Sequence, residues 1–424
     1  MNYQEAIRYL RSYKRNTGEL SLKNLNKLLD YMNHPEKKLK FIHVAGTNGK
    51  GSTCKMLSSI LRSAGYKVGL FTSPFLETEN EQIQINGQVI SNEDFAKVCK
   101  KVKDFSSYLM LDEMPTEFEL TTAMAFQYFY ETNCDLVVLE VGLGGELDAT
   151  NVIETPLVSV FTNIGIDHVD YLGKTIKEIA YKKAGIIKEN GIVISYEQTK
   201  EVEEVIKIRC EERHSRLIVA DFSNLKLHQE NLSGQKFSYK QNTNLSLSLI
   251  GEHQRKNAAV VLEVISQLQM LGYKVSPNAI TEGISYVTWP GRFEVLCKKP
   301  LVILDGGHNV QCVEAFTEVL KQFIQGKKAT VILGVLADKD YQGMIPYLVP
   351  LTKRFITVTP KNSRALPSIQ LAEELSKYHP LVSSYTSPVE GIMAALRDAR
   401  EDDIICAIGS LYMAAEIRDC FIHE

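Results

Sequence analysis

Short apolar runs alternate along this chain with stretches in which apolar residues recur every three or four positions. From residue 41 onward the runs are rich in Val, Ile and Leu, which is typical of buried β-strands. They predict strands at 41–45, 68–72, 136–141, 158–162, 192–195 and 217–220. The helical spacing predicts helices at 52–64, 119–132 and 176–187. Because strands that alternate with helices form parallel sheets, we expect an α/β fold.

A second series of strands and helices follows a segment of different character. Residues 221–250 are polar with a short alternating stretch, which predicts a small antiparallel excursion, and 254–271 predicts a long helix that ends at Gly272. Strands are predicted again at 301–304, 329–335, 355–359 and 404–408. Pro290 and Gly291 separate the two series, since both break helices. We therefore expect a parallel-sheet domain at 1–291 and a smaller Rossmann-like α/β domain at 292–424.

Composition narrows the class of protein. The 424 residues are 44% hydrophobic and 23% charged with a net charge of -3, so the chain lacks the basic field that nucleic-acid binding leaves. No apolar stretch is long enough to span a membrane, and residues 1–15 have no apolar core that could serve as a signal peptide. The eight cysteines form no Cys-x-x-Cys pair. These features predict a cytoplasmic globular protein that binds neither nucleic acid nor membranes.

A glycine-rich loop lies between the first predicted strand and the first predicted helix. Residues 43–52 read His-Val-Ala-Gly-Thr-Asn-Gly-Lys-Gly-Ser. Glycines let backbone N–H groups close around phosphate oxygens, the helix N-terminus attracts negative charge, and Lys50 supplies a positive charge for the terminal phosphates. Gly51 stands where Ser or Thr follows the lysine in the general pattern, and Ser52 comes one position later. The loop predicts a site for a nucleoside triphosphate.

The Gly-Thr-Asn-Gly-Lys core of this loop resembles the ATP loop of the Mur ligase superfamily, whose members join amino acids to carboxylates. The Gly-Ser that follows is the form typical of its folylpolyglutamate synthase and dihydrofolate synthase branch. Further blocks that resemble this branch follow in the same order between residues 41 and 412. The resemblance implies a P-loop ATPase-like first domain, and it assigns ATP binding to Gly46, Thr47, Asn48, Gly49, Lys50, Gly51 and Ser52.

Three residues are candidates for binding magnesium. Glu140 closes a hydrophobic strand, and a carboxylate at the carboxyl end of a parallel strand is well placed to bind a hard cation. The resemblance assigns Glu140 to magnesium and adds Ser73, from the block Thr-Ser-Pro-Phe-Leu at 72–76. It also assigns His168 to a second magnesium ion. Histidine is not the preferred ligand of a hard cation, so that assignment rests on the resemblance alone.

Lys183 precedes an Ala-Gly-Ile sequence, and in proteins of this branch the lysine at that position is carbamylated by carbon dioxide. This chemistry requires a neutral amine, hence a lysine pKa lowered by burial or by nearby positive charge. The chain departs from the usual pattern at two positions. Phe75 stands where many members have His, and Gln82 stands in an Asn-Glu-Gln-Ile block that usually reads Asn-Glu-Arg-Ile. The resemblance places Phe75 at the pterin site.

The remaining candidates lie further along the chain. Asn257, in the block at 251–257, is expected to approach the adenine, although such a polar cluster is also typical of an ordinary helix start. Arg292 is expected to reach phosphate with its forked donor set. The resemblance assigns nucleotide contacts to Asp305 and His308, and an acidic residue at a strand end suits ribose hydroxyls. Ser410 belongs to a block that is expected to line the glutamate pocket.

The resemblance implies one reaction for all these parts. ATP converts the terminal carboxylate of a folate into an acyl phosphate, and the amine of glutamate then displaces phosphate to form an amide. Lys50, Lys183 and His168 are the expected catalytic residues, ATP and Mg²⁺ the expected cofactors, and the expected partners are folate or dihydropteroate, L-glutamate and ATP. We expect the chain to be a monomer.

Other functions account for parts of this sequence. Dihydrofolate synthase, which adds the first glutamate to dihydropteroate, uses the same fold and is expected either as a second activity or as the sole one. A peptidoglycan Mur ligase fits less well because of Gly51-Ser52 and the Ser73-Pro74 block. A P-loop switch leaves the second α/β domain unexplained, and no Asn-Lys-x-Asp guanine signature is present. A non-enzymatic binding protein would release no ADP.

Overall fold

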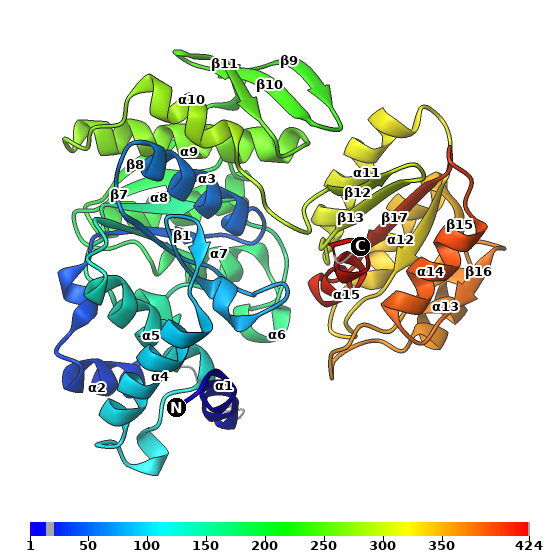
Figure 1. The fold of residues 1–424 in the computed structure, drawn as a ribbon. Coiled ribbons are helices and arrows are strands. Elements are labelled where there is room, and N and C mark those ends of the chain that lie inside the picture. Colours follow the sequence, from blue (N-terminus) through cyan, green and yellow to red (C-terminus); the bar gives the residue numbers. More distant parts are fainter. Residues whose placement is uncertain (14–20, 423–424) are drawn as a thin grey trace. The chain divides into compact units, whose positions relative to one another are not determined.

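The structure, a computed structural model, describes residues 1–13 and 21–422 (Figure 1). The chain divides into two compact units by its contacts. The first consists of Met1–Lys226, Ser238–Leu245 and Lys256–Val287. The second consists of Leu227–Phe237, Ser246–Arg255 and Thr288–Glu424. No helix in the described part of the chain is both long and apolar enough to cross a membrane.

The first unit is built on an eight-stranded sheet with strand order β4-β3-β2-β5-β1-β6-β7-β8. All neighbouring strands from β2 to β8 in this order are parallel, and β3 and β4 add an antiparallel hairpin at one edge. The strands are β1 (Phe41–Ala45), β2 (Val68–Phe71), β3 (Ile83–Ile85), β4 (Gln88–Val89), β5 (Leu136–Glu140), β6 (Val158–Phe161), β7 (Ile192–Ser195) and β8 (Arg216–Val219).

Helices cover both faces of this sheet (Figure 1). On one face α3 contacts β1, β2 and β5, and α10 packs on α3 so closely that a Cβ on Gly283 would lie 2.4 Å from the Cα of Ile60. On the other face α1, α2, α4 and α5 form one apolar cluster with Phe41, Phe71 and Val137. The helices are α1 (Tyr3–Ser12), α2 (Lys23–Tyr31), α3 (Lys50–Ser63), α4 (Asn92–Ser106), α5 (Glu117–Glu131), α6 (Val169–Leu172), α7 (Ile176–Ala184), α8 (Lys200–Glu212), α9 (Glu252–Met270) and α10 (Pro277–Ser285).

The polar segment before α9 forms a three-stranded sheet with order β11-β10-β9. Its strands are β9 (Leu225–Asn231), β10 (Gly234–Tyr239) and β11 (Asn242–Leu247). Two-residue turns join them, which only antiparallel neighbours allow. These three strands occupy the segment 221–250, for which a small antiparallel excursion was expected.

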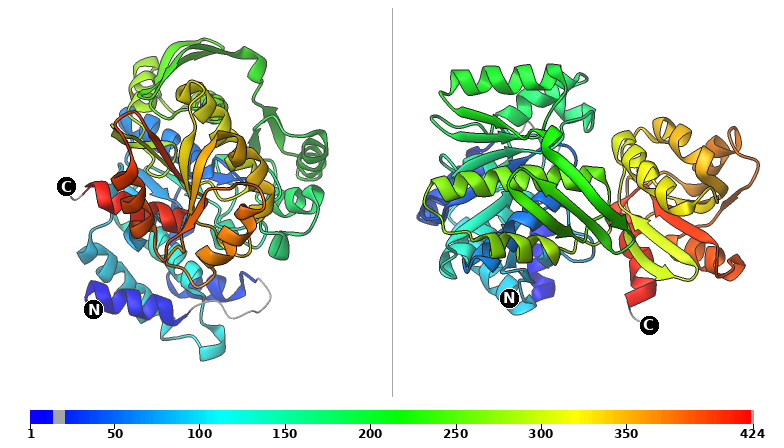
Figure 2. Two further views of the ribbon diagram at one scale, coloured as in Figure 1. Left: turned by 90° about the vertical axis from the view of Figure 1, so that its right-hand side faces the viewer. Right: turned by 90° about the horizontal axis from the view of Figure 1, so that it is seen from above.

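The second unit contains a six-stranded sheet with order β12-β13-β17-β14-β15-β16, in which only β12 is antiparallel to its neighbour. Its strands are β12 (Glu294–Lys298), β13 (Leu301–Asp305), β14 (Ala329–Leu333), β15 (Thr352–Thr357), β16 (Val382–Ser384) and β17 (Ile404–Ile408). Helices flank this sheet on both faces, as Figure 2 shows. They are α11 (Val310–Ile324), α12 (Tyr341–Leu348), α13 (Ser368–Ser376), α14 (Pro388–Asp398) and α15 (Leu411–Ile422).

The predicted α/β fold is confirmed, and the errors lie at element ends. The helix expected at 176–187 ends at Ala184, because Gly185 caps it and the chain turns toward β7. The strand expected at 355–359 lies at Thr352–Thr357, since Thr352 already pairs with Ala329. The strands β3, β4, β12 and β16, which lie at or next to the edges of their sheets, were not predicted. They are short or half exposed, so the apolar signal of a buried strand is weak there.

Candidate functional site

The glycine-rich loop follows β1, at the point where the order in which the chain adds strands to the sheet reverses. β1 lies between β5 and β6, and the chain proceeds from β1 toward β2 on one side and later to β6 on the other. Ligands of open α/β sheets bind at such a switch point, outside the carboxyl ends of the strands. Val44 pairs with Glu140 and Ala45 with Phe161, so the loops after β1, β5 and β6 begin at the same edge.

Two glycines shape this loop because no other residue fits. Gly46 has φ +151°, and a Cβ there would lie 1.9 Å from Thr162 Oγ1. Gly49 has φ +88°, and a Cβ there would lie 2.6 Å from Asn257 Oδ1. Positive φ with so close a neighbour admits only glycine. The predicted adenine residue Asn257 is thus buried directly against the loop.

Hydrogen bonds fasten the loop to the segment that follows β6. The N–H groups of Thr47 and Asn48 donate to the carbonyl oxygen of Asn163 at 2.8 and 3.2 Å. Thr47 Oγ1 donates to the carbonyl of Gly165 at 3.0 Å. The Gln198 side chain in turn holds that segment, donating to the carbonyl of Thr162 and accepting from the N–H of Ile164. These contacts within the protein therefore hold the loop in its shape.

The helix α3 begins at the end of the loop and directs its N-terminus toward it. The first N–H groups of any helix have no partner within the helix, and they attract anions. Lys50 is the first residue of α3, and its Nζ donates to the carbonyl of Thr47 at 3.3 Å. Gly51 and Ser52 follow in the first turn, and Thr53 carries a buried hydroxyl oxygen without a hydrogen-bond partner. Residues 46–52 thus form a loop and helix start suited to phosphate.

Two of the predicted magnesium residues lie side by side. Glu140 ends β5, is only 4% exposed, and accepts the N–H of Ser73 at 3.2 Å through Oε2. Ser73 follows β2, so the two residues belong to neighbouring strands. Within the described residues no group of three or more His, Cys, Asp or Glu side chains could hold a metal ion by itself. The oxygens of Ser73 and Glu140 nevertheless fit Mg²⁺, which keeps waters and binds few protein carboxylates.

His168 occupies a different setting from these two residues. It lies in the segment after β6 with φ +51°, and its side chain is exposed at the start of the short helix α6. The neighbouring Asp167 is close enough for its charge to act on Lys183. The sequence prediction of His168 as a magnesium ligand therefore remains a prediction.

Lys183 is buried against the nucleotide loop. It is 4% exposed, and its Nζ donates to the carbonyl of Gly46 at 2.8 Å. Burial, aided by the positive charge of Lys50, lowers the pKa of Lys183 to about 7, while Asp167 and Asp148 oppose the shift. A large fraction of this amine is consequently neutral near neutral pH.

Two glycines, Gly145 and Gly185, allow the close packing that brings Lys183 to the nucleotide loop. A Cβ on Gly145 would lie 2.6 Å from the carbonyl oxygen of Lys183. A Cβ on Gly185 would lie 2.3 Å from the Cβ of Glu146. The Gly-rich turn after β5 therefore packs directly on the end of α7. Asn151 closes this contact by donating to the carbonyls of Glu146 and Gly185.

Beside Lys183 lies a buried polar chain that joins Asp148 and Thr150 to His43. Asp148 accepts the N–H of Leu143 at 2.8 Å and the N–H and hydroxyl of Thr150, and burial raises its pKa. Thr150 Oγ1 lies 2.8 Å from Nε2 of His43, which stands in the middle of β1. Burial lowers the pKa of His43 to about 3, so this histidine is neutral. A histidine inside an apolar strand was the signal that could have revealed the chain.

The second unit carries its own group of predicted residues at the carboxyl end of β13. Asp305 accepts the N–H groups of Phe293 and Gly307 at 2.8 and 2.7 Å, and burial raises its pKa while Arg292 opposes that shift. Nδ1 of His308 lies 3.1 Å from the carbonyl oxygen of Gly306, and because a carbonyl oxygen only accepts, Nδ1 donates in this hydrogen bond.

Ser410, predicted for the substrate, follows β17 at the start of α15. Its side chain is 2% exposed, and its Oγ accepts the N–H of Tyr412 at 3.2 Å. Its carbonyl accepts the N–H of Ala414. These contacts give Ser410 a structural part in beginning the helix, and Phe75 is the only predicted substrate residue in the first unit, half-buried in the loop after β2.

Comparison with known proteins matches this arrangement. Residues 44–265 match the Mur ligase middle domain, and residues 291–411 match the Mur ligase glutamate ligase domain. Together with the loop at 46–52, these domains define an ATP-dependent ligase.

The relatives narrow this class further. The chain is 37% identical to the dihydrofolate synthase/folylpolyglutamate synthase of Bacillus subtilis over 98% of each chain. It resembles the folylpolyglutamate synthase of Mycobacterium tuberculosis complexed with ADP, with 28% identity, a TM-score of 0.92, and coverage of 100% and 98%. Escherichia coli FolC in complex with DHPP and ADP is 30% identical, with a TM-score of 0.86 over 99% and 97% of the two chains. The chain belongs to the folylpolyglutamate synthase and dihydrofolate synthase family.

Proposed function

We propose that this chain adds L-glutamate to folates through an amide bond, using ATP and releasing ADP and phosphate. The observation that carries the proposal is the nucleotide loop with buried Lys183 against it, in a chain that matches such enzymes over its full length. The γ-phosphoryl group passes from ATP to an oxygen of the folate carboxylate, which yields ADP and an acyl phosphate. The glutamate amine then attacks the acyl carbon, the amide forms, and phosphate leaves.

The first step requires positioning and neutralisation of phosphate charge more than covalent chemistry by the protein. We assign ATP binding to residues 46–52 and Asn257, an assignment that the ADP-bound and AMPPCP-bound structural neighbours support. Lys50, at the start of α3, offsets the charge of the terminal phosphates. Arg292, Asp305 and His308 are proposed for nucleotide binding from the C-terminal domain.

We propose that Ser73 and Glu140 hold magnesium, with His168 at a second ion. Bound magnesium would supply positive charge at the phosphate oxygens. The buried Glu140 carboxylate accepts the N–H of Ser73, so these two oxygen donors lie close together.

Lys183 is proposed to be carbamylated. The reaction joins the neutral amine to carbon dioxide and releases one proton, so that a buried cation becomes an anion. The lowered pKa of Lys183 supplies the neutral amine, and the contact with Gly46 places the modified side chain beside the nucleotide loop.

A second activity, the addition of the first glutamate to dihydropteroate, is proposed alongside the first. The Bacillus subtilis relative carries both names, and the Escherichia coli neighbour was solved with DHPP as well as ADP. Both reactions use the same activation of a carboxylate, so they need no separate catalytic residues.

The test is ADP release by the purified chain with magnesium and glutamate, with tetrahydrofolate in one reaction and dihydropteroate in another. Release in both reactions, with glutamate-extended products found by mass spectrometry, is the expected result. Release with tetrahydrofolate alone would remove the second activity. Release in neither reaction, while a control enzyme is active, would overturn the folate assignment.

A further inference from the structure

The segment between β2 and β3 contains a carboxylate that has no part in the functions proposed above. Glu81 belongs to the Asn-Glu-Gln-Ile block at 80–83, and its side chain turns back into the loop that carries Ser73 and Phe75. Its Oε2 accepts the N–H of Leu76 at 2.9 Å. Its Oε1 accepts the N–H groups of Glu77 and Thr78 at 2.8 and 2.7 Å.

Three consecutive backbone N–H groups thus converge on one carboxylate. Such a concave set of donors binds anions in many proteins, and hydrogen bonds to an ionised acceptor are stronger than neutral ones. Here the anion comes from the chain itself. Thr78 completes a reciprocal cap with Glu81, in which each residue accepts a backbone N–H of the other. The loop 73–78 is therefore closed upon Glu81.

The neighbours of Glu81 fix this carboxylate to the rest of the first unit. Asn80 is 4% exposed and donates to the carbonyl of Ile90 at 2.8 Å and to the side chain of Asn92 at 3.1 Å. The carbonyl of Gln82 accepts the N–H of Thr72 at the beginning of the loop. The block at 80–82 therefore anchors both the base of the loop and, through Glu81, its far side.

The other end of the loop is held at the proposed magnesium site, where the N–H of Ser73 donates to Glu140. Only Pro74 and Phe75 lie between Ser73 and Leu76, the first residue whose N–H donates to Glu81. The position of Phe75 is consequently set by Glu140 on one side and by Glu81 on the other.

We propose that Glu81 is a positioning residue for the ligase reaction, because its carboxylate holds the loop 73–78 in the shape that receives the pteridine-bearing substrate. This inference rests on the proposed function and on the prediction that Phe75 lies at the pterin site. Glu81 itself touches neither nucleotide nor reacting atoms in this account, and it acts through the loop.

The variant Glu81→Gln tests the proposal, because the amide keeps the shape of the side chain but offers one acceptor oxygen in place of two. Its NH₂ group then faces an N–H donor. Glu79→Gln is the matched control, since it removes the same charge two residues away, where the carboxylate pairs with Arg11 and not with the loop.

Two measurements are made on the full chain. Hydrogen exchange of the amides of Leu76, Glu77 and Thr78 in the free protein is expected to accelerate at least ~10-fold in Glu81→Gln and to stay unchanged in Glu79→Gln. The KM for the folate substrate is expected to rise by about 10-fold in Glu81→Gln, while the binding of ADP measured without folate changes less than ~2-fold.

A merely stabilising role would lower the thermal midpoint and leave the folate KM of the folded protein unchanged, and this outcome would overturn the proposal. So would unchanged exchange at the three amides. If Glu81→Gln does not fold, Glu81→Asp serves in its place, because it keeps the charge but shortens the reach of the carboxylate. Failure of the proposed function shows separately, as absence of turnover by the native chain, and the exchange measurement does not depend on it.

Discussion

Charged side chains gather in two regions of this chain, and their surroundings make them behave in opposite ways. The first lies at the carboxyl edge of the eight-stranded sheet, where Lys183, Asp148 and Glu140 are each 4% exposed. Burial there lowers the pKa of Lys183 and raises that of Asp148, so both of these groups are pushed toward their neutral forms. The second region lies in the other unit, at the amino ends of strands β14, β15 and β17 of the six-stranded sheet.

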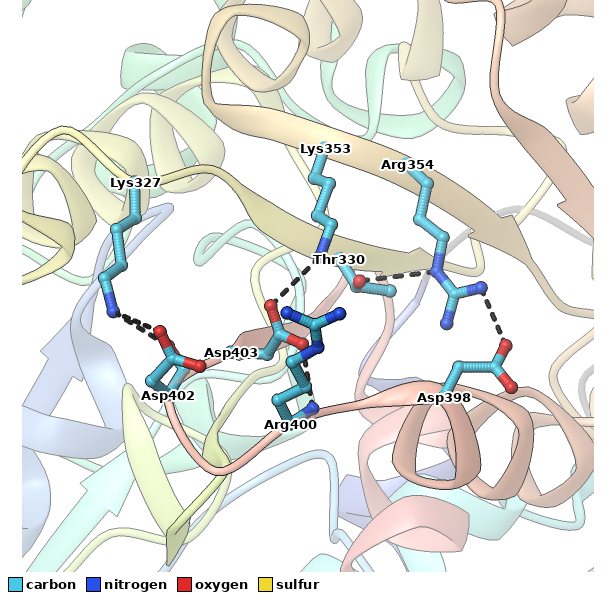
Figure 3. A network of polar contacts seen from close by, with 8 residues as sticks. All are labelled: Lys327, Thr330, Lys353, Arg354, Asp398, Arg400, Asp402 and Asp403. Carbon is cyan, nitrogen blue, oxygen red and sulfur yellow. Dashed lines mark hydrogen bonds and ion pairs between the residues drawn. The ribbon is translucent and has the colours of Figure 1, made fainter.

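Figure 3 shows this second region, where Lys327, Lys353 and Arg354 each pair with a different aspartate near the surface. Lys327 pairs with Asp402 at 3.1 Å, Lys353 with Asp403 at 3.0 Å, and Arg354 with Asp398 at 2.9 Å. Arg400 also donates its N–H to Asp403. These hydrogen bonds lower the pKa of all three aspartates, so each group is held in its charged form.

Both regions contain lysine and aspartate side chains, so the opposite shifts in their pKa values follow from burial and not from the kind of side chain. Water screens the exposed pairs, so each contributes little. In the buried region the protein shields Lys183 from water, and the lowered pKa supplies the neutral amine that the proposed carbamylation requires. The following changes test this contrast, beginning with the largest expected effect.

Lys50→Met is expected to reduce ADP release at least ~100-fold, because the terminal phosphates lose the charge at the start of α3. Lys55→Met is the matched control on the same helix, since Lys55 donates to the Gln84 side chain instead of the loop. Steady-state kinetics with saturating ATP would show the difference. Equal losses of ADP release in both variants would mean that any positive charge on α3 serves as well as that of Lys50, which would contradict its assignment to the terminal phosphates.

Carbamylation of Lys183 is expected to follow pH in a defined direction. Because the pKa of Lys183 is lowered to about 7, the neutral amine is the minor form at pH 6 and the major form at pH 8. The carbamate signal in ¹³C NMR with labelled bicarbonate should therefore rise by up to ~10-fold between these values. It should be absent in Lys183→Gln and retained in Lys182→Gln. A signal that survives in Lys183→Gln would assign it to another amine.

Gly185→Ala is expected to lower the free energy of unfolding by about 1–3 kcal/mol, because the added Cβ overlaps Glu146 at 2.3 Å. Gly191→Ala provides the comparison, as its Cβ would meet nothing closer than 3.1 Å. Chemical denaturation measures both. If the two variants unfold alike, the turn after β5 is not packed on α7 as described.

Asp402→Asn is expected to have the smallest effect, because its pair with Lys327 is exposed. The lowered pKa of Asp402 means that the pair stabilises the fold above the ordinary aspartate pKa and that this contribution is lost as pH falls through the folded pKa. A small drop in thermal midpoint at neutral pH should therefore disappear in high salt and in strong acid, with ADP release unchanged. A large drop in ADP release would contradict the contrast between the regions.

The sequence predicted those parts of the site that have a strong local signal. The strand, glycine loop, lysine and helix at 41–64 form one continuous pattern, and the structure places them as expected apart from helix ends. The family resemblance led us to expect that the pKa of Lys183 is lowered by burial or nearby positive charge. Lys183 is buried against Gly46 with a lowered pKa, while its carbamylation stays a prediction.

The remaining parts depend on contacts between distant residues. Nothing in the local pattern around His43 indicates that it lies beside Thr150, 107 positions later. Glu81 looks like an ordinary surface glutamate until the loop before it folds back on its carboxylate. The requirement for glycine at positions 145 and 185 becomes apparent only in the folded chain, where the turn after β5 packs on the end of α7.

Transfer of ¹⁸O tests the central claim most directly. A folate labelled with ¹⁸O in its terminal carboxylate is incubated with the chain, ATP, magnesium and glutamate, and the released phosphate is analysed by mass spectrometry. The acyl phosphate route transfers one carboxylate oxygen to phosphate for each amide formed. We predict one labelled oxygen per phosphate released. Amide formation with unlabelled phosphate, or no amide at all, would contradict the account.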